Sequence, residues 1–238
     1  MFLETADIET ATADYASRFH GVAGEYFLDK QTEVTLSLLS DFPKAKILDV
    51  GGGHAQLAEP LIKHGFDVTV TGSDDSCKKR LSQRIPQVDF EYTTCDSLNL
   101  PFTDRSFDVV MSFRLLSHVD RWPELIAELT RVAKYCVLFD YADRRSMNIL
   151  YSHLFHMKKQ MEGNTRHFNL FSRSKMSKEL QKNGFKEPVF KPQFFCPMVI
   201  HRKLSNRLIS SAMEGCFRVA GVTQFFGSPI ILRSDRSE

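Results

Sequence analysis

Short continuous apolar runs alternate with segments of helical periodicity over the first 150 residues. The apolar runs predict strands at 45–50, 66–71, 88–93, 107–113 and 135–141. The intervening polar-faced segments predict helices at 55–64, 76–84 and 122–132. Continuous rather than alternating apolar runs indicate strands that are buried on both faces, as in a parallel sheet covered by helices. We therefore predict an α/β fold with a doubly wound, mostly parallel seven-stranded sheet and helices on both of its faces.

The rest of the chain is less regular and predicts additions to this sheet. Residues 12–39 have a helical pattern, and Ser172 is the expected N-cap of a helix that runs to Gly184. A closing pair of strands is predicted at 185–195 and 229–233, with a helix between them at 203–215. We expect one domain over residues 1–238, with a helical cap at 1–40 and lid-like insertions at 142–171 and 196–227.

Composition and charge narrow the class of protein. The 238 residues are 42% hydrophobic and 25% charged, which excludes a disordered or fibrous chain. A net charge of +2 gives no general attraction to nucleic acid or to an anionic membrane, so neither partner is expected. The sequence contains no run of 18 apolar residues, so no membrane span is predicted. The first residues lack the pattern of a signal peptide.

The cysteines indicate a reducing compartment. The five of them are odd in number, widely spread and without a CxxC pair, which disfavours a disulfide framework and a zinc site. We expect most of them to be buried as small apolar residues. The prediction is a cytoplasmic protein.

The segment 47–55, ILDVGGGHA, carries the most information about chemistry. Its glycines let the chain turn sharply and let a ligand approach the backbone without meeting a Cβ. The dinucleotide pattern GxGxxG fails because Gln56 stands at its third glycine, and the phosphate-loop pattern GxxxxGK[ST] lacks its lysine. Asp49 would also repel a phosphate. These residues favour a ligand with an ammonium group, and with a carboxylate near backbone N–H donors.

Several motifs in order resemble those of the class I S-adenosylmethionine-dependent methyltransferases, over about residues 12–195. The loop DVGGGHA, from Asp49 to Ala55, is similar to the motif acidic-x-Gly-x-Gly-x-Gly, with alanine in the last place. VTVTGSDDS (68–76) resembles the second-strand motif of the family. CDSLNLPFTDRSFDVVMSF (95–113) is similar to a pattern of the small-molecule branch, which includes enzymes of quinone biosynthesis. HVDRWPELIAELTRVAK (118–134) resembles the helix that follows, without the usual Pro-Gly-Gly after it.

The resemblance implies that S-adenosylmethionine is the cofactor and S-adenosylhomocysteine the product. It implies that Asp74 binds both ribose hydroxyls and that Asp96 contacts the adenine amino group, while Asp75 stands where an apolar residue is usual. The spacing between Asp49 and Asp74 agrees with a strand–helix–strand step, although each acid alone would more often cap a helix. The predicted cofactor-binding residues are Tyr15, Asp49, Gly51, Gly52, Gly53, Asp74, Asp75, Cys95, Asp96, Ser97 and Phe113.

Two residues near predicted strand ends are candidate catalytic bases. His118 follows the fourth predicted strand and Asp140 lies near the end of the fifth. Packing or helix capping explains His118 at least as well, and a structural role for Asp140 is an even alternative. No metal is expected, because the nearby histidines lack a Cys or carboxylate at ligand spacing. Those histidines are His153, His156 and His167.

Two further groups of residues are ambiguous. The basic residues within 142–176 fit either an anionic acceptor or a solvated helix face. The phenylalanines of the last third suit either an apolar or aromatic acceptor pocket or the packing of the closing strands. They are Phe185, Phe190, Phe194, Phe195, Phe217, Phe225 and Phe226.

The resulting hypothesis is an enzyme that transfers a methyl group from S-adenosylmethionine to an O, N or C atom of a small-molecule acceptor by in-line displacement. An RNA or protein methyltransferase is disfavoured by the near-neutral charge and by the lack of an Asn-Pro-Pro-Tyr type motif at 112–115. A non-catalytic S-adenosylmethionine-binding protein stays open, because the chemistry has no obligatory catalytic residue. The oligomeric state also stays open, with a homodimer as one alternative.

Overall fold

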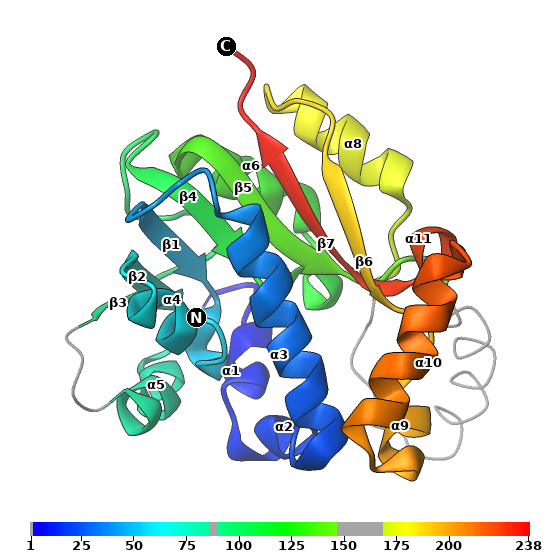
Figure 1. The fold of residues 1–238 in the computed structure, drawn as a ribbon. Coiled ribbons are helices and arrows are strands. Elements are labelled where there is room, and N and C mark those ends of the chain that lie inside the picture. Colours follow the sequence, from blue (N-terminus) through cyan, green and yellow to red (C-terminus); the bar gives the residue numbers. More distant parts are fainter. Residues whose placement is uncertain (1, 86–89, 147–168) are drawn as a thin grey trace.

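The computed structural model describes residues 2–85, 90–146 and 169–238, and its centre is a sheet of seven strands (Figure 1). The strand order is β3-β2-β1-β4-β5-β7-β6, in which β7 runs antiparallel to both β5 and β6. The first five strands pair in parallel. The predicted doubly wound, mostly parallel seven-stranded sheet is thus confirmed. The strands are β1 Lys46–Val50, β2 Asp67–Gly72, β3 Glu91–Thr94, β4 Phe107–Ser112, β5 Ala133–Tyr141, β6 Val189–Phe194 and β7 Ser228–Asp235.

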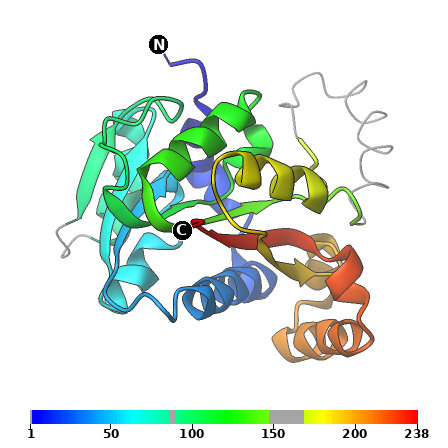
Figure 2. The ribbon, with the colours of Figure 1, turned by 90° about the horizontal axis from the view of Figure 1, so that it is seen from above.

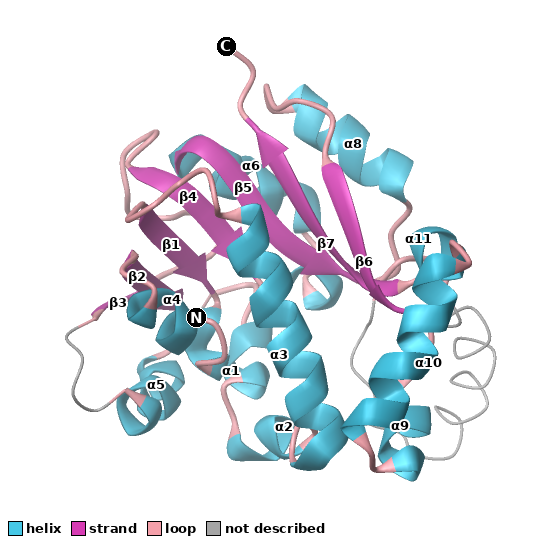
Figure 3. Ribbon diagram, viewed as in Figure 1, coloured by secondary structure: helices cyan, strands magenta, loops and turns pink. Residues whose placement is uncertain are grey.

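Helices cover both faces of this sheet, as the view from above shows (Figure 2). Helices α6 and α8 lie on one face, and α3 lies on the other. Further helices join β6 to β7 (Figure 3). The α-helices are α1 Ala6–Thr10, α2 Ala13–Ser17, α3 Gly21–Leu38, α4 Ala58–Lys63, α5 Lys78–Arg84, α6 Trp122–Val132, α8 Arg173–Lys182, α9 Met198–Leu204, α10 Arg207–Val219 and α11 Val222–Phe226. Short 3-10 helices are η1 Gly52–His54, η2 Asp75–Cys77 and η3 Leu116–His118.

The side chains of the central strands divide between two apolar cores, one on each face. Val110 of β4 and Val137 of β5 pack in the core beneath α6 and α8. Their sequence neighbours Met111 and Leu138 pack in the core on the other face, together with residues of α3, α4 and α5. Because successive side chains of a strand point to opposite faces, a strand buried on both sides must be apolar throughout. This is the physical origin of the continuous runs in the sequence.

Two predicted helices are each divided in the structure, so their predicted extents were wrong. The segment 12–39 contains α2 and α3, and a further helix, α1, precedes them. Thr12 Oγ1 accepts a hydrogen bond from Tyr15 N and so starts α2 as an N-cap. The segment 203–215 falls on α9 and α10, because Ser205 adopts a positive φ and Asn206 caps a new helix. The predicted N-cap Ser172 is confirmed by its hydrogen bond from Lys175 N.

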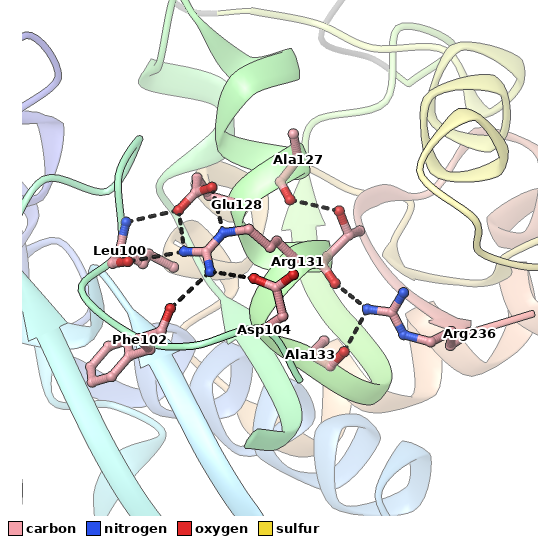
Figure 4. Close-up of polar contacts among 9 residues, drawn as sticks. Leu100, Phe102, Asp104, Ala127, Glu128, Arg131, Ala133 and Arg236 are labelled. Atoms are coloured by element: carbon pink, nitrogen blue, oxygen red, sulfur yellow. Dashed lines mark hydrogen bonds and ion pairs between the residues drawn. The ribbon is translucent and has the colours of Figure 1, made fainter. Parts of the chain in front are cut away.

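One arginine holds the loop between β3 and β4 against helix α6 (Figure 4). Arg131 donates to the backbone oxygens of Leu100 and Phe102 at 2.9 and 2.8 Å. It also pairs with Glu128 and with Asp104, at 2.7 and 2.8 Å. Asp96 lies near the start of this loop, so the network restrains the segment that carries one of the predicted ligand-binding acids.

The structure also bears on the predictions about the cysteines and about a membrane span. Cys77, Cys95, Cys136 and Cys196 are buried and only Cys216 is exposed, and all are free thiols. Within the described ranges, none of the helices has both the length and the apolar character that crossing a bilayer requires.

Candidate functional site

The predicted ligand-binding residues meet at the carboxyl ends of neighbouring parallel strands. Asp49 lies in β1 just before the glycine loop, Asp74 follows β2, and Phe113 follows β4. Cys95, Asp96 and Ser97 follow β3. Since β3, β2, β1 and β4 are adjacent in the sheet, all of these residues lie along one edge. In open α/β sheets this edge is where ligands bind.

The glycine loop after β1 leaves no room for larger side chains. Gly51 has φ +75°, and a Cβ on it would lie 2.8 Å from Leu115 Cδ2. A Cβ on Gly52 would lie 2.2 Å from Asp49 Oδ2. Ala55 also adopts a positive φ, which delays α4 until Ala58 although a helix from 55 was predicted. The loop thus brings bare backbone to the sheet edge, as the motif predicts.

Asp49 is a buried acid with no polar partner. Its side chain is fully buried, and neither carboxylate oxygen has a hydrogen-bond partner among the described residues. Burial raises the pKa of this carboxyl from 3.8 to about 7. An unpaired buried carboxylate is unfavourable, so a cationic or hydrogen-donating ligand at this position would compensate it.

The acids after β2 and β3 are more exposed. Asp74 is exposed, and its pKa is lowered by hydrogen bonds from the Ser76 side chain and from Ser76 N, the latter at 2.8 Å. Asp75 accepts a hydrogen bond from Thr94 Oγ1 of β3. Asp96 accepts one from Leu98 N at 2.9 Å. The cap-forming role considered for Asp74 is therefore present, and its carboxylate is on the exposed side.

Helix α1, which the sequence pattern missed, lies directly on the glycine loop. The Asp7 carboxylate accepts hydrogen bonds from Ser73 N and Ser73 Oγ, at 2.6 and 2.5 Å. Asp7 Cβ lies 3.5 Å from the position of a Gly51 Cβ, and Ala11 Cβ lies 3.1 Å from that of a Gly53 Cβ. A ligand that approaches this loop must share its surface with α1 or displace it. No local signal in the sequence marks Asp7, because its partners lie 66 positions away.

The glycine loop and the carboxylates along this sheet edge suit the cofactor that the motifs imply. The glycines form a cradle that a Cβ would fill, and Asp49 supplies two buried oxygens without partners. Asp74 and Asp96 supply further carboxylates along the same edge. These residues fit a ligand with an ammonium group, ribose hydroxyls and an exocyclic amine.

A cavity of about 230 Å³ lies near the carboxyl ends of β4 and β5. Tyr15, predicted to bind cofactor, lines this cavity beside Arg114 and Asp140. Its assignment to the cofactor stays a prediction. The remaining lining residues are Phe19, Phe27, Gln31, Gln193, Phe194, Met198, Pro229 and Ile231.

Arg114 is the main feature of this cavity that the sequence interpretation missed. It follows β4 in a left-handed conformation with φ +59°. Its Nη2 donates to Gln31 Oε1 at 2.9 Å, and its guanidinium carbon lies 3.8 Å from the centre of the Phe19 ring. A cation directly after the apolar run FDVVMSF was the available signal, since strand ends line the ligand-binding edge.

The two candidate bases occupy different positions. Asp140 lines the cavity, is buried, and accepts a hydrogen bond from Arg114 N at 2.6 Å. Burial raises the pKa of Asp140 to about 6, and the bond from Arg114 opposes that rise. His118 lies in η3, outside the lining of the cavity as the described residues form it. Of the two candidates, Asp140 is therefore the one that lines this cavity.

The predicted phenylalanine, histidine and basic groups lie in different parts of the structure. Of the seven phenylalanines in the last third, only Phe194 lines the cavity, while Phe185 is in the core and Phe225 is 59% exposed. The other cavity phenylalanines come from the N-terminal segment. The candidate metal ligands His153, His156 and His167 lie outside the described residues. Three of the seven basic residues within 142–176, which are Lys158, Lys159 and Arg166, also lie outside them. Among the described residues, no cluster of three metal-ligating side chains occurs.

A family model described as a methyltransferase domain matches residues 24–187, which is more than half of the chain. A phthiotriol/phenolphthiotriol dimycocerosates methyltransferase of Mycobacterium tuberculosis is 34% identical over 114 residues, covering 45% of this chain and 41% of that protein. A demethylmenaquinone methyltransferase of Streptomyces griseus is 29% identical over 139 residues, covering 54% and 60%. The match thus spans about two fifths of the length of the mycobacterial relatives.

Solved structures share the fold. A magnesium protoporphyrin IX methyltransferase from Synechocystis PCC 6803, crystallised with bound SAH, superposes with a TM-score of 0.67. The two chains are 16% identical, and the superposition covers 94% of each. At this identity the likeness establishes the architecture.

Proposed function

Because the chain belongs to the methyltransferase domain family, we propose that it transfers a methyl group from S-adenosylmethionine to a small-molecule acceptor. The observation that carries the proposal is the bare glycine loop beside the unpartnered, buried Asp49. This loop is at the same sheet edge as a separate aromatic cavity that can hold the acceptor. Relatives named demethylmenaquinone methyltransferase and ubiquinone biosynthesis O-methyltransferase support a small acceptor.

Each predicted cofactor residue has a definite task in this proposal. Gly51 and Gly53 allow the ligand to contact backbone, and Asp49 accepts from its ammonium group. Asp74 binds the ribose hydroxyls, and Asp96 binds the adenine amine. When bound, S-adenosylmethionine supplies a methyl group on a positively charged sulfur, which is already activated toward a nucleophile.

The residues of the cavity orient the acceptor and exclude water. Alignment of two reactants can contribute about 7–11 kcal/mol to lowering a barrier, so the walls of the cavity matter more than any single base. Asp140 is placed to take a proton from an acceptor hydroxyl or amine, and its raised pKa brings it closer to neutral pH. His118 stays a second candidate for this role.

Calorimetric titration of the purified protein with S-adenosylmethionine and with S-adenosylhomocysteine tests the cofactor. Micromolar binding of both, with no response to NAD, is the expected result. Methyl transfer in a screen of small molecules, followed by mass spectrometry, then tests catalysis. Binding without transfer to any acceptor would favour the non-catalytic alternative, and salt-dependent RNA binding would favour the nucleic-acid alternative.

The cellular compartment and the oligomeric state of the protein are also proposals. The free, mostly buried cysteines support a reducing compartment, which we take to be the cytoplasm. Homodimerisation stays an alternative that size-exclusion chromatography with light scattering can test.

A further inference from the structure

We propose that Arg114 selects the acceptor, and that the acceptor is a small, flat, apolar molecule that carries one anionic oxygen. The inference rests on the proposed function, because it names the substrate class of the cavity described above. It follows from four features of that cavity as the described residues form it: a guanidinium nitrogen without a partner, no carboxylate in ion-pair contact with the guanidinium, aromatic walls and a strained backbone at Arg114.

The guanidinium of Arg114 has one edge without an acceptor. Its Nη2 donates to Gln31 Oε1, and its face lies over the Phe19 ring. Its Nη1 is buried and has no hydrogen-bond partner among the described residues. A buried donor without a partner is unfavourable by an amount comparable to a lost hydrogen bond. A ligand oxygen that accepts from Nη1 removes this deficit.

Among the described residues, the Arg114 guanidinium also has no carboxylate in direct ion-pair contact. Its side-chain partners are all uncharged: the Gln31 amide, the Tyr15 hydroxyl and the Phe19 ring. The nearby Asp140 carboxylate accepts instead from the backbone N–H of Arg114. Because a buried cation is stabilised most by an anion in direct contact, an anionic oxygen suits this position better than a neutral carbonyl.

The walls of the cavity define the rest of the acceptor. Aromatic rings from Tyr15, Phe19, Phe27 and Phe194 line it, and Phe27 stacks on Phe194 with centroids 3.7 Å apart. Flat apolar molecules pack well against such rings. The volume of about 230 Å³ is below the range of about 300–1,000 Å³ typical of drug-sized ligands, which favours a small acceptor.

The backbone at Arg114 supports a functional role. A non-glycine residue with φ +59° is held in a conformation that few residues adopt, and such strain clusters at ligand sites. Here the bond from Arg114 N to Asp140 Oδ1 holds the conformation. The strained conformation thereby ties the selecting cation to the candidate base.

The test is equilibrium binding of matched probes, without cofactor. The probes are benzoate and cinnamate, their methyl esters and amides, and 4-nitrophenolate as an anion that is not a carboxylate. We expect the anions to bind at least about tenfold more tightly than the neutral esters and amides, which is the typical effect of one charged hydrogen bond. Comparison of benzoate with 4-nitrophenolate then distinguishes carboxylate from phenolate acceptors.

Two variants keep the test independent of folding defects. Arg114→Gln should remove the preference for anions, and Gln31→Glu should weaken it by supplying an internal carboxylate while leaving Arg114 in place. The control Arg207→Gln removes an exposed arginine of α10 that pairs with Asp29, and it should leave the preference unchanged. Circular dichroism and thermal unfolding establish that each variant is folded.

Either of two results would overturn the inference: anions that bind no better than their esters, or a preference for anions that survives both cavity variants. Cofactor binding is measured separately on the same proteins. If the unmodified protein does not bind the cofactor, the proposed function is contradicted. An absent preference for anions in a protein that does bind cofactor contradicts only the role of Arg114.

Discussion

The carboxylate of Asp7 accepts hydrogen bonds from both the backbone N–H and the hydroxyl of Ser73, 66 positions further along the chain. This pair fastens helix α1 onto the end of β2, directly against the glycine loop. Ligand access to the loop therefore depends on how firmly α1 is held.

Replacement of Asp7 by alanine should strengthen cofactor binding. Loss of both bonds to Ser73 makes displacement of α1 easier, and we expect S-adenosylhomocysteine to bind about fivefold more tightly by calorimetry. The control Glu9→Ala changes an acid of the same helix that pairs with Arg18 instead. Unchanged or weaker binding by the Asp7 variant would mean that α1 stays in place over the ligand.

Replacement of Asp74 by alanine should weaken cofactor binding by about tenfold to a hundredfold, because ribose hydroxyls would lose a charged acceptor. Asp67→Ala is the matched control, since Asp67 is an exposed acid at the opposite end of the same strand. Calorimetry on both variants measures the difference. Equal affinities would remove Asp74 from the ribose site.

Replacement of Gly51 by valine should abolish cofactor binding and also lower stability. The positive φ makes a β-branched residue unfavourable by about 1–3 kcal/mol, and its Cβ would collide with Leu115. Gly65→Val is the control, because Gly65 also has a positive φ but nothing lies within 4 Å of its Cβ position. If both variants bind cofactor equally well, the loop is not the binding surface.

Asp49 should make the stability of the ligand-free protein fall as pH rises. Its pKa is raised to about 7 in the folded state, so between about pH 4 and pH 7 the folded state holds a proton that the unfolded state has lost. The unfolding free energy then decreases by up to about 1.4 kcal/mol per pH unit in this window. Denaturant unfolding of the unmodified protein and of Asp49→Asn should differ by this slope, and parallel curves would exclude the shift.

Asp140 and His118 can be distinguished as bases by their variants. With an acceptor from the screen, turnover should rise with pH around the pKa of about 6 of Asp140, because only its ionised form takes a proton. Asp140→Asn keeps an oxygen that can accept from Arg114 N but should remove this step from the pH profile. His118→Ala should leave the profile unchanged; a lost step there, with Asp140→Asn still active, would reverse the two roles.

Local pattern was sufficient for much of the fold. The helix 122–132 agrees with α6 at both ends, because its apolar residues repeat at helical spacing and Pro123 marks its first turn. The prediction of one continuous helix over 12–39 was wrong. The breaks at Thr12 and Gly21 depend on a helix cap and on a positive φ, which hydrophobic periodicity does not reveal.

Most of the order of strands and helices along the chain, and the place of the glycine loop with Asp49, Asp74 and Asp96, follow from the sequence alone. These depend on local rules: apolar runs make buried strands, and parallel strands bring their carboxyl ends to one edge. Only the packed structure shows that Asp7 accepts hydrogen bonds from Ser73. It also shows that Phe19, Phe27 and Phe194 line the same cavity as Arg114. Such contacts join segments far apart in the chain, so they arise only when helices and sheet pack together, and no periodicity encodes them.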